Sequence, residues 1–407
     1  MRVDTVVVGA GPAGTAAGSE LAKGGADVLV VDRAVFPRDK CCGDGLTTLA
    51  LRELERLGLD PAAVRSWTPV DRVAIVGPSG REITYPLPAG PGTHAAIARR
   101  QDLDAALVDL ARAHGAEVRE GHAQQDARAV DGGAELGIEG IGSVRARHVV
   151  GADGMWSPLR RALGMAIEGY RGEIHAVRQY VVDVAPRAAE ELAIWFEPDL
   201  LPGYAWSFPL ADGTANVGLG VHRGGRVAVG DLKKVWLDFL ERPHIRSFLG
   251  PDARPEAPMK AWPIPARVGR APLTGPDTLF VGDAATVTDP MTGEGIGQAL
   301  LTGRAAAESI LAGGDVTGRY EATVRAELVA DDRMARALLP VLARPFTARA
   351  ALRITALTPW TRRNVARWMF EDYPRALVLT PRRWHRGVFT GPGAYQGHAR
   401  GGPNDVS

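Results

Sequence analysis

The chain has 407 residues, of which 45% are hydrophobic and 23% are charged. These fractions are typical of globular proteins and exclude a disordered or fibrous chain, and the length predicts two closely joined domains. Lysine plus arginine (48) nearly balances aspartate plus glutamate (47), so no overall field favours nucleic acid as a partner.

The first thirty residues predict a strand–helix–strand unit. An apolar run at 5–8 ends in glycines, small residues at helical spacing follow from 13 to 21, and a second apolar run at 28–31 ends on Asp32. The glycines fit GxGxxG, a turn that lets backbone amides and a helix N-terminus approach a pyrophosphate. Asp32 is suited to bind a ribose hydroxyl pair. The residues expected at the cofactor here are Gly9, Gly11, Pro12, Ala13, Gly14, Asp32 and Arg33.

The middle of the chain leaves this nucleotide-binding domain and returns to it. The predicted elements are a loop at 33–45, a helix at 46–57, strands at 73–76 and 82–85, a helix beginning at Arg100 and a strand at 146–150. Strand formers then predominate from 174 to 263. They predict strands at 175–182, 192–196 and 215–221, with a helix at 232–240.

A second glycine-rich turn follows a buried-type strand at 279–281 and opens a helix at 299–311. Asp283 is placed to accept hydrogen bonds from a ribityl chain. The N-terminus of the helix is suited to stabilise the negative charge that reduction builds on a flavin pyrimidine. Paired with the first turn, this one predicts FAD. Its cofactor residues are Gly282, Asp283, Gly293, Gly295 and Ile296.

The predicted fold class is α/β. A Rossmann-type FAD-binding domain is assembled from discontinuous segments, an α+β substrate domain is built on an antiparallel sheet, and the C-terminal region is helical. The expected boundaries are 1–70, 98–165 and 270–312 for the FAD-binding domain, 71–97 and 166–269 for the substrate domain, and 313–407 for the C-terminal region.

Together with the GADG segment at 151–154, the two turns resemble the p-hydroxybenzoate hydroxylase-like class of FAD proteins. In that class an arginine that opens the helix after the first strands contacts the flavin phosphate or ribityl region. The resemblance implies this role for Arg100, with Arg99 as a competitor, and places Asp153 at the cofactor.

Two further segments resemble signature segments of the geranylgeranyl reductase family, which saturates isoprenoid double bonds. They are PRDKCCGDGL at 37–46 and YAWSFP at 204–209. The resemblance implies that the loop carrying Cys42 runs close to the isoalloxazine and that an aromatic segment lines the substrate cavity. The implied cofactor residues are Cys42, Gly43, Asp44 and Gly45, and the implied substrate residues are Tyr204, Trp206, Phe208 and Pro290.

Reduction of an isolated alkene needs a flavin hydride, a proton source and an apolar slot. Cys42 is a candidate to donate or position the proton, with a buried structural thiol as the alternative. Tyr204 and Trp206 are expected to act at the substrate, as cavity lining more than as acids, with plain core packing as the alternative. Because the sequence shows no second dinucleotide motif, it leaves two alternatives for the reductant, NAD(P)H or another reduced carrier.

Other functions fit the same flavin motifs. The main alternative is an FAD-dependent monooxygenase that hydroxylates an aromatic or natural-product substrate. A flavin-dependent halogenase fits less well, because that family carries Trp-x-Trp-x-Ile-Pro where this chain has YAWSFP. A non-catalytic flavin-binding protein is disfavoured by the presence of both flavin half-sites and Cys42.

Residues 341–400 hold eleven arginines, three tryptophans and only two acids, Glu371 and Asp372, which are interpreted as ordinary surface residues. This composition suggests peripheral contact with an anionic membrane that holds a prenylated lipid or quinone substrate. A solvated basic face and internal ion pairing are the alternatives.

The remaining features bear on compartment and metals. Cys41 and Cys42 are adjacent, which disfavours a disulfide between them. The nine histidines show no metal-ligand spacing, so no metal is expected. No export signal and no uncharged apolar run of about 18 residues is visible, which favours a cytoplasmic protein, with the inner face of the membrane as a possible location. The oligomeric state stays open.

Overall fold

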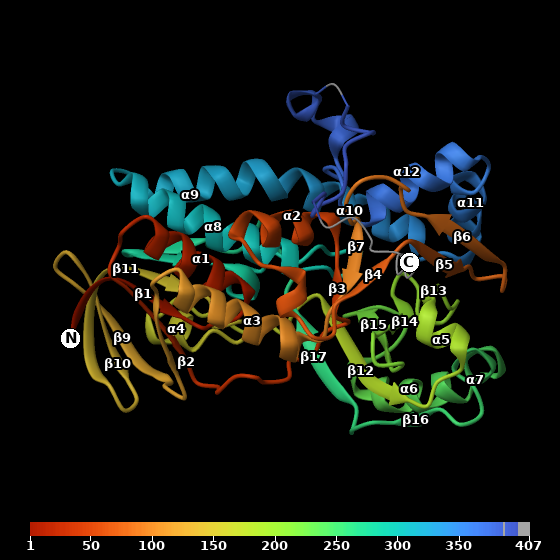
Figure 1. Cartoon of the computed structure of the whole chain (residues 1–407), viewed down its shortest axis with the longest axis horizontal. Coiled ribbons are helices and arrows are strands. Elements are labelled where there is room, and N and C mark those ends of the chain that lie inside the picture. Colours follow the sequence, from red (N-terminus) through yellow and green to blue (C-terminus); the bar gives the residue numbers. More distant parts are fainter. Residues whose placement is uncertain (386, 398–407) are drawn as a thin grey trace, which may run out of the picture.

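A mostly parallel sheet carries the N-terminal unit at its centre in this computed structural model, which describes residues 1–385 and 387–397 (Figure 1). β1 (Arg2–Val8) pairs in parallel with β11 (Gly142–Gly151) on one side and with β2 (Val28–Asp32) on the other. Beyond them lie β8 (Glu117–Glu120) on one flank and β19 (Thr278–Phe280) and β18 (Thr274–Gly275) on the other. The predicted strand–helix–strand unit is thus confirmed.

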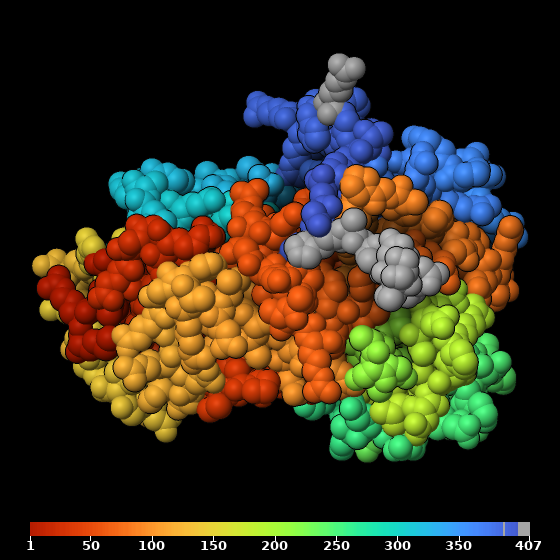
Figure 2. All heavy atoms as spheres, viewed as in Figure 1, coloured from red at the N-terminus to blue at the C-terminus, as the bar shows by residue number. Residues whose placement is uncertain are grey.

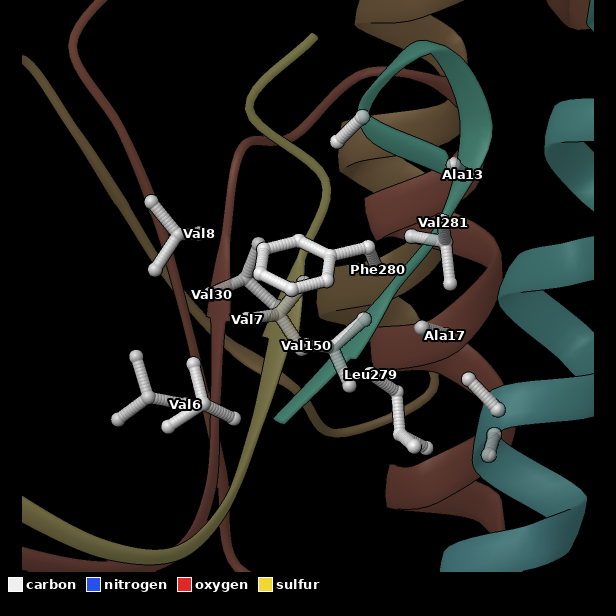
Figure 3. Close-up of a cluster of buried hydrophobic side chains, with 14 of the residues drawn as sticks. Val6, Val7, Val8, Ala13, Ala17, Val30, Val150, Leu279, Phe280 and Val281 are labelled. Atoms are coloured by element: carbon white, nitrogen blue, oxygen red, sulfur yellow. The ribbon is translucent and has the colours of Figure 1, made fainter. Parts of the chain in front are cut away.

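Small residues let two helices pack closely against this sheet. α1 (Pro12–Lys23) lies against α8 (Ile296–Ala312), where a Cβ on Gly303 would stand 2.1 Å from the Ala13 carbonyl oxygen. Figure 3 shows valines of adjacent strands meeting Ala13 and Ala17 of α1. Because these valines and alanines are buried together, the glycine turn rests on a rigid core.

An antiparallel hairpin extends this sheet and was not predicted. β9 (Gln124–Val130) and β10 (Gly133–Ile138) pair with each other, and β10 pairs with β11. β11 itself begins at Gly142, several residues before the predicted start. Only Ala127 of β9 is buried, and most of the other residues in that strand are polar, so β9 lacks the alternating apolar pattern that marks a strand in the sequence.

The second large sheet is mainly antiparallel, as predicted for the substrate domain. Its order is β16-β12-β15-β14-β13-β5-β6, with β17 also on β12, and only β13 and β5 run parallel. Its strands are β5 (Arg72–Val76), β6 (Glu82–Pro86), β12 (Ile174–Val182), β13 (Leu192–Trp195), β14 (Tyr204–Pro209), β15 (Ala215–His222), β16 (Arg254–Pro255) and β17 (Lys260–Ile264). One face packs on α6 (Leu232–Glu241) and α7 (Pro243–Leu249), with Trp236 and Phe239 at the centre of that core.

A small third sheet joins the two parts of the molecule. β7 (Ala95–Ile97) pairs with β3 (Gly45–Leu46) and β4 (Thr68–Val70), and α2 (Thr48–Leu57) follows directly after β3. β7 leads into α3 (Arg100–Ala113). The loop that carries Cys42 is therefore fixed at its end to the strand that precedes Arg100. The domain boundaries drawn from the sequence stay predictions.

The C-terminal region is helical, as predicted. It contains α9 (Val316–Val324), α10 (Ala330–Leu342), α11 (Pro345–Thr355) and α12 (Pro359–Met369), with a π-helical turn at Arg325–Val329. The Tyr320 hydroxyl of α9 donates to the Phe280 carbonyl at 2.5 Å and so attaches the region to the parallel sheet. Within the described ranges, no helix is long and apolar enough to span a bilayer.

The interpretation of Glu371 and Asp372 as surface residues is wrong. Asp372 is 5% exposed and accepts hydrogen bonds from Arg52 and Arg367. Glu371 accepts from Gln298 Nε2 at 2.6 Å and from Thr47 Oγ1 at 2.8 Å. These partners, except for Arg367, come from elements more than seventy residues away, so the local sequence gave no sign of the burial.

Candidate active site

A cavity of about 810 Å³ extends from the N-terminal glycine turn to the aromatic strand β14. The predicted site residues that line it are Gly9, Gly11, Pro12, Ala13, Asp32, Arg33, Cys42, Gly43, Gly45, Arg100, Asp153, Tyr204, Trp206, Phe208, Gly282, Asp283, Gly293, Gly295 and Ile296. Three predicted residues do not line it: Gly14, Asp44 and Pro290. Pro290 lies instead in a separate cavity of about 160 Å³.

The first glycine turn is shaped to admit a cofactor backbone. Gly9 has φ +107°, and a Cβ there would stand 2.3 Å from the Ala152 carbonyl oxygen. A Cβ on Gly14 would stand 1.8 Å from the Gly9 carbonyl oxygen, so Gly14 serves helix packing. At Gly11 a Cβ would meet only Arg38 Nη2, at 3.7 Å, which leaves the N-terminus of α1 open to the cavity. An open cradle of amides fits a pyrophosphate.

Asp32 is held rigidly at the end of β2. Its two carboxylate oxygens accept hydrogen bonds from the Ala10 amide at 2.7 Å and the Ala34 amide at 2.8 Å. Each oxygen keeps a further lone pair for a ligand. The carboxylate lines the same cavity as the glycine turn, as binding of an adenosine ribose requires.

The second glycine turn faces the same cavity from α8. Gly282 has φ +59°, and a Cβ there would stand 3.0 Å from the Ala13 Cβ, which brings this turn over the start of α1. Asp289 Oδ1 accepts from the amides of Met291 and Thr292 at 2.9 and 2.8 Å and so fixes the turn that precedes Gly293. Both turns therefore open on one cavity, as a flavin dinucleotide needs.

Arg100 lines the cavity but is already paired. Its guanidinium binds Asp104 through two hydrogen bonds, at 2.9 and 2.8 Å, and the residue is 7% exposed. Arg99 binds Asp212 and Glu256 and does not line the cavity. Of the two arginines, only Arg100 lines the cavity, and its contact with the flavin stays a prediction.

Asp44 organises the loop that carries Cys42. It is fully buried with φ +66°, and its Oδ2 accepts from the Tyr180 hydroxyl at 2.7 Å and from Asn216 Nδ2 at 2.8 Å. Burial raises the pKa of Asp44 to about 6, although these hydrogen bonds and nearby arginines oppose the shift. Asp44 therefore positions the loop and does not face the cavity.

Cys42 itself lines the cavity as a free thiol. Burial raises the pKa of this thiol, so it carries its proton at neutral pH. Its Sγ accepts a hydrogen bond from the Asp44 amide at 3.4 Å. The neighbouring Cys41 is also free, and burial raises its thiol pKa to about 12. Both interpretations of Cys42, proton donor and structural thiol, remain compatible with this setting.

The aromatic wall consists of Tyr204, Trp206 and Phe208, which share one face of β14. The ring centroids of successive members lie 6.0 and 6.1 Å apart. The Tyr204 hydroxyl donates to the Thr292 carbonyl. Behind the wall, a Cβ on Gly218 of β15 would stand 2.3 Å from Trp206 Cζ2, so Gly218 sets the position of the indole. Because the Tyr204 hydroxyl proton is donated to this carbonyl, Tyr204 is better suited to line the cavity than to act as an acid.

Asn216 connects the aromatic wall to the Cys42 loop, and the sequence did not reveal it. Its Oδ1 accepts from Trp206 Nε1 at 3.1 Å, and its Nδ2 donates to the Cys42 carbonyl at 2.9 Å as well as to Asp44. It is fully buried. A single asparagine within the apolar strand 215–221 was the only available signal, since a buried amide needs partners.

An Asn216→Ala variant is expected to lower the free energy of unfolding by about 1–3 kcal/mol, because it leaves the Trp206 N–H and the Asp44 carboxylate short of partners. Denaturant unfolding measures this loss. Trp206→Phe removes one of the same hydrogen bonds, so the double variant should lose less than the sum of the two single variants. Strict additivity would contradict the connection.

The fold and the two turns define a class of FAD-binding protein, and a match to an FAD binding domain model over residues 2–207 agrees. A geranylgeranyl reductase catalytic domain model matches residues 173–247, which include the aromatic wall. The chain belongs to the geranylgeranyl reductase family of FAD-dependent oxidoreductases. This confirms the resemblance inferred from the Cys42 loop and the aromatic segment.

Relatives of known name support the assignment. A menaquinone reductase of Mycolicibacterium smegmatis is 35% identical over 77% of this chain and 77% of its own length. A digeranylgeranylglycerophospholipid reductase of Methanopyrus kandleri is 34% identical over 76% of each chain. Among solved structures, a geranylgeranyl bacteriochlorophyll reductase-like protein of Thermoplasma acidophilum superposes with a TM-score of 0.78 at 23% identity, covering 94% of this chain and 99% of its own.

A flavin-dependent brominase also shares the architecture, with a TM-score of 0.73 at 21% identity over 93% of this chain and 97% of its own. At that identity the likeness shows the fold alone. The fold is therefore common to reductases and halogenases, and the site residues must distinguish them.

Proposed function

We propose that this protein saturates carbon–carbon double bonds in the prenyl side chain of a lipid quinone. The observation that carries the proposal is the aromatic wall at β14, which faces the second glycine turn within one cavity. When bound and reduced, FAD supplies a hydride. The chain's own residues supply an apolar slot, water exclusion and proton delivery.

Roles of individual residues follow from their places in the cavity. The amides around Gly11 hold the pyrophosphate, Asp32 the adenosine ribose and Asp283 the ribityl chain. Cys42, on its loop, would lie beside the ring of bound flavin. Tyr204 and Trp206 hold the prenyl chain against it.

A glycerophospholipid with prenyl chains is the second candidate substrate, because the similarity to the archaeal enzyme is nearly as high as that to the quinone reductase. Both substrates offer the same isolated alkenes and differ in the head group. Because both substrates offer the same alkene to the cavity, an experiment must separate them. NAD(P)H or another reduced carrier delivers the electrons.

The experiment mixes anaerobic, dithionite-reduced protein with menaquinone in one arm and digeranylgeranylglycerophospholipid in the other. A mass gain of two hydrogens per saturated bond, in the quinone arm before the phospholipid arm, is the expected result. If only the phospholipid is reduced, the proposed quinone substrate is wrong, whereas the proposed reduction of prenyl double bonds stands. A product that gains oxygen only in air, with no anaerobic turnover, overturns the proposal in favour of a monooxygenase.

We further propose that the C-terminal region contacts an anionic membrane. Internal ion pairs engage Arg367, Arg375 and Arg383, but other arginines of the region are exposed, while Arg386 and Arg400 lie outside the described residues. The exposed arginines are Arg344, Arg349, Arg353, Arg363 and Arg382. Large apolar side chains accompany them, namely Phe346, Ile354, Leu357, Trp360, Val378, Leu379 and Trp384, each at least 60% exposed. Their segments lie along the upper edge of the molecule in Figures 1 and 2.

A Phe346→Ser, Trp360→Ser double variant is expected to weaken binding to vesicles of phosphatidylglycerol and phosphatidylcholine by about tenfold or more, because each large apolar side chain contributes about 1.5–3 kcal/mol on burial. Co-sedimentation measures the binding. Leu237→Ser is the matched control, since Leu237 is 54% exposed on α6, outside this surface. Equal losses in both variants, or no loss in either, would contradict the membrane contact.

A further inference from the structure

Glu294 lines the cavity from the middle of the second glycine turn, between the predicted cofactor residues Gly293 and Gly295. Its backbone is fixed by the Asp289 amide, which donates to the Glu294 carbonyl at 2.9 Å. Its carboxyl approaches the Cys42 loop, because a Cβ on Gly45 would stand 3.4 Å from Glu294 Oε1. The same Cβ would stand 3.2 Å from the Phe208 ring, so the carboxyl lies beside the aromatic wall.

The groups around Glu294 oppose its ionisation. Among residues that the structure describes, none donates a hydrogen bond to its carboxyl. Arg375, the cation whose charge acts on Glu294, is shared with Asp289 at 3.2 Å and Glu371 at 3.4 Å. Burial, followed by repulsion from Glu371, raises the pKa of Glu294 to about 8, although Arg375 opposes the shift. The carboxyl is therefore a neutral acid at neutral pH with an uncommitted proton.

Other proton carriers near the wall are less available. The Tyr204 hydroxyl is donated to the Thr292 carbonyl, and burial raises the pKa of Tyr204. Asp44 lies outside the cavity lining and accepts bonds from Tyr180 and Asn216. Cys42 keeps its proton and remains a competitor in the lining. Glu294 differs from it in having a pKa close to the working pH, as a general acid needs.

We propose that Glu294 is the catalytic acid that protonates the substrate alkene; this rests on the proposed function. The π pair of the alkene takes the Glu294 proton to form one C–H bond. A hydride from reduced flavin forms the second C–H bond, which leaves the flavin oxidised by two electrons. The Glu294 carboxylate then takes a proton from water.

The first test measures the protonation state of the Glu294 carboxyl group and needs no turnover. Infrared difference spectra of the wild-type protein, compared with Glu294→Gln, should show a protonated carboxyl band at pH 7 that disappears as the pH passes about 8. The matched control, Glu190→Gln, changes an exposed carboxylate and should leave that band unchanged. Absence of a Glu294-dependent band at pH 7 overturns the proposal, whatever the substrate proves to be.

The second test follows single-turnover reoxidation of reduced flavin by the prenyl alkene. Glu294→Gln should bind FAD with an unchanged visible spectrum but lose at least about 100-fold in rate, the usual contribution of a general acid. The wild-type and Cys42→Ala rates should fall above pH about 8, and the residual Glu294→Gln rate should not. Glu294→Asp should recover part of the rate.

The outcomes separate the two proposals. A full rate in Glu294→Gln together with a lost rate in Cys42→Ala assigns the proton to Cys42 and overturns this inference. If the wild-type protein reduces no prenyl alkene, the proposed function fails, and the infrared band still decides whether Glu294 is a neutral acid. If Glu294→Gln purifies without FAD, Glu294→Asp replaces it and should keep part of the wild-type rate while the pH at which that rate falls changes. A pH profile identical to that of the wild-type protein then overturns the inference.

Discussion

A Gly11→Val variant is expected to fold and to purify without flavin. The space around Gly11 is open except for Arg38 Nη2, so valine fits the apoprotein without displacing backbone. Its methyl groups would occupy the mouth of the amide cradle, where the pyrophosphate approaches closely. The expected loss of FAD affinity is at least about 100-fold, measured by flavin absorbance after purification and by titration of the apoprotein with FAD.

Two comparisons make this result specific. Gly90→Val changes an exposed glycine with nothing within 4 Å and should keep its flavin. Gly14→Val places side-chain atoms against the Gly9 carbonyl and should damage the fold as well as flavin binding. A Gly11→Val protein that retains full flavin would refute the assignment of this turn to the pyrophosphate.

Replacement of Arg375 by alanine is expected to lower the free energy of unfolding by about 3–5 kcal/mol. Arg375 is 3% exposed and is the ion-pair partner of Asp289 and Glu371, which stay buried without that partner when it is removed. It also donates to Thr292 Oγ1 at 3.2 Å, so the second glycine turn loses its support and FAD should bind more weakly. Thermal and denaturant unfolding measure the stability, and flavin titration measures the affinity.

Arg363→Ala is the matched control, because Arg363 is exposed on the neighbouring helix α12. Surface arginines contribute little to stability, so a change within about 0.5 kcal/mol is expected there. Comparable losses in both variants would show that Arg375 has no special part in holding the turn.

The sequence predicted the regular parts of the molecule well because their patterns are local. Apolar runs bounded by glycine marked β1, β2 and β19, and strict leucine spacing marked α3. The glycine turns were visible for the same reason. In each turn, the positions that must lack a side chain fall within six or seven consecutive residues. The Cys42 loop and aromatic segment were found by resemblance.

What escaped prediction depends on contacts between distant segments. Asn216 is important because β14, β15 and the Cys42 loop converge on it. Glu294 is important because burial beside Glu371 keeps its carboxyl group neutral. Asp372 seemed exposed because its partner Arg52 is 320 positions away. Pro290 follows the turn's sequence but faces away into a second cavity. No local pattern encodes any of these pairings.

The absence of a side chain at Gly218 has a consequence for substrate selectivity. The Trp206 indole rests directly on that position, and the Val177 carbonyl oxygen lies 2.5 Å from the same Cβ position, so a larger residue at 218 would displace the indole or the neighbouring strand and change the space in front of the indole. The space left for a prenyl chain beside the indole then depends on the residue behind the aromatic wall. A residue that never touches the substrate can in this way change which prenyl chains the cavity accepts.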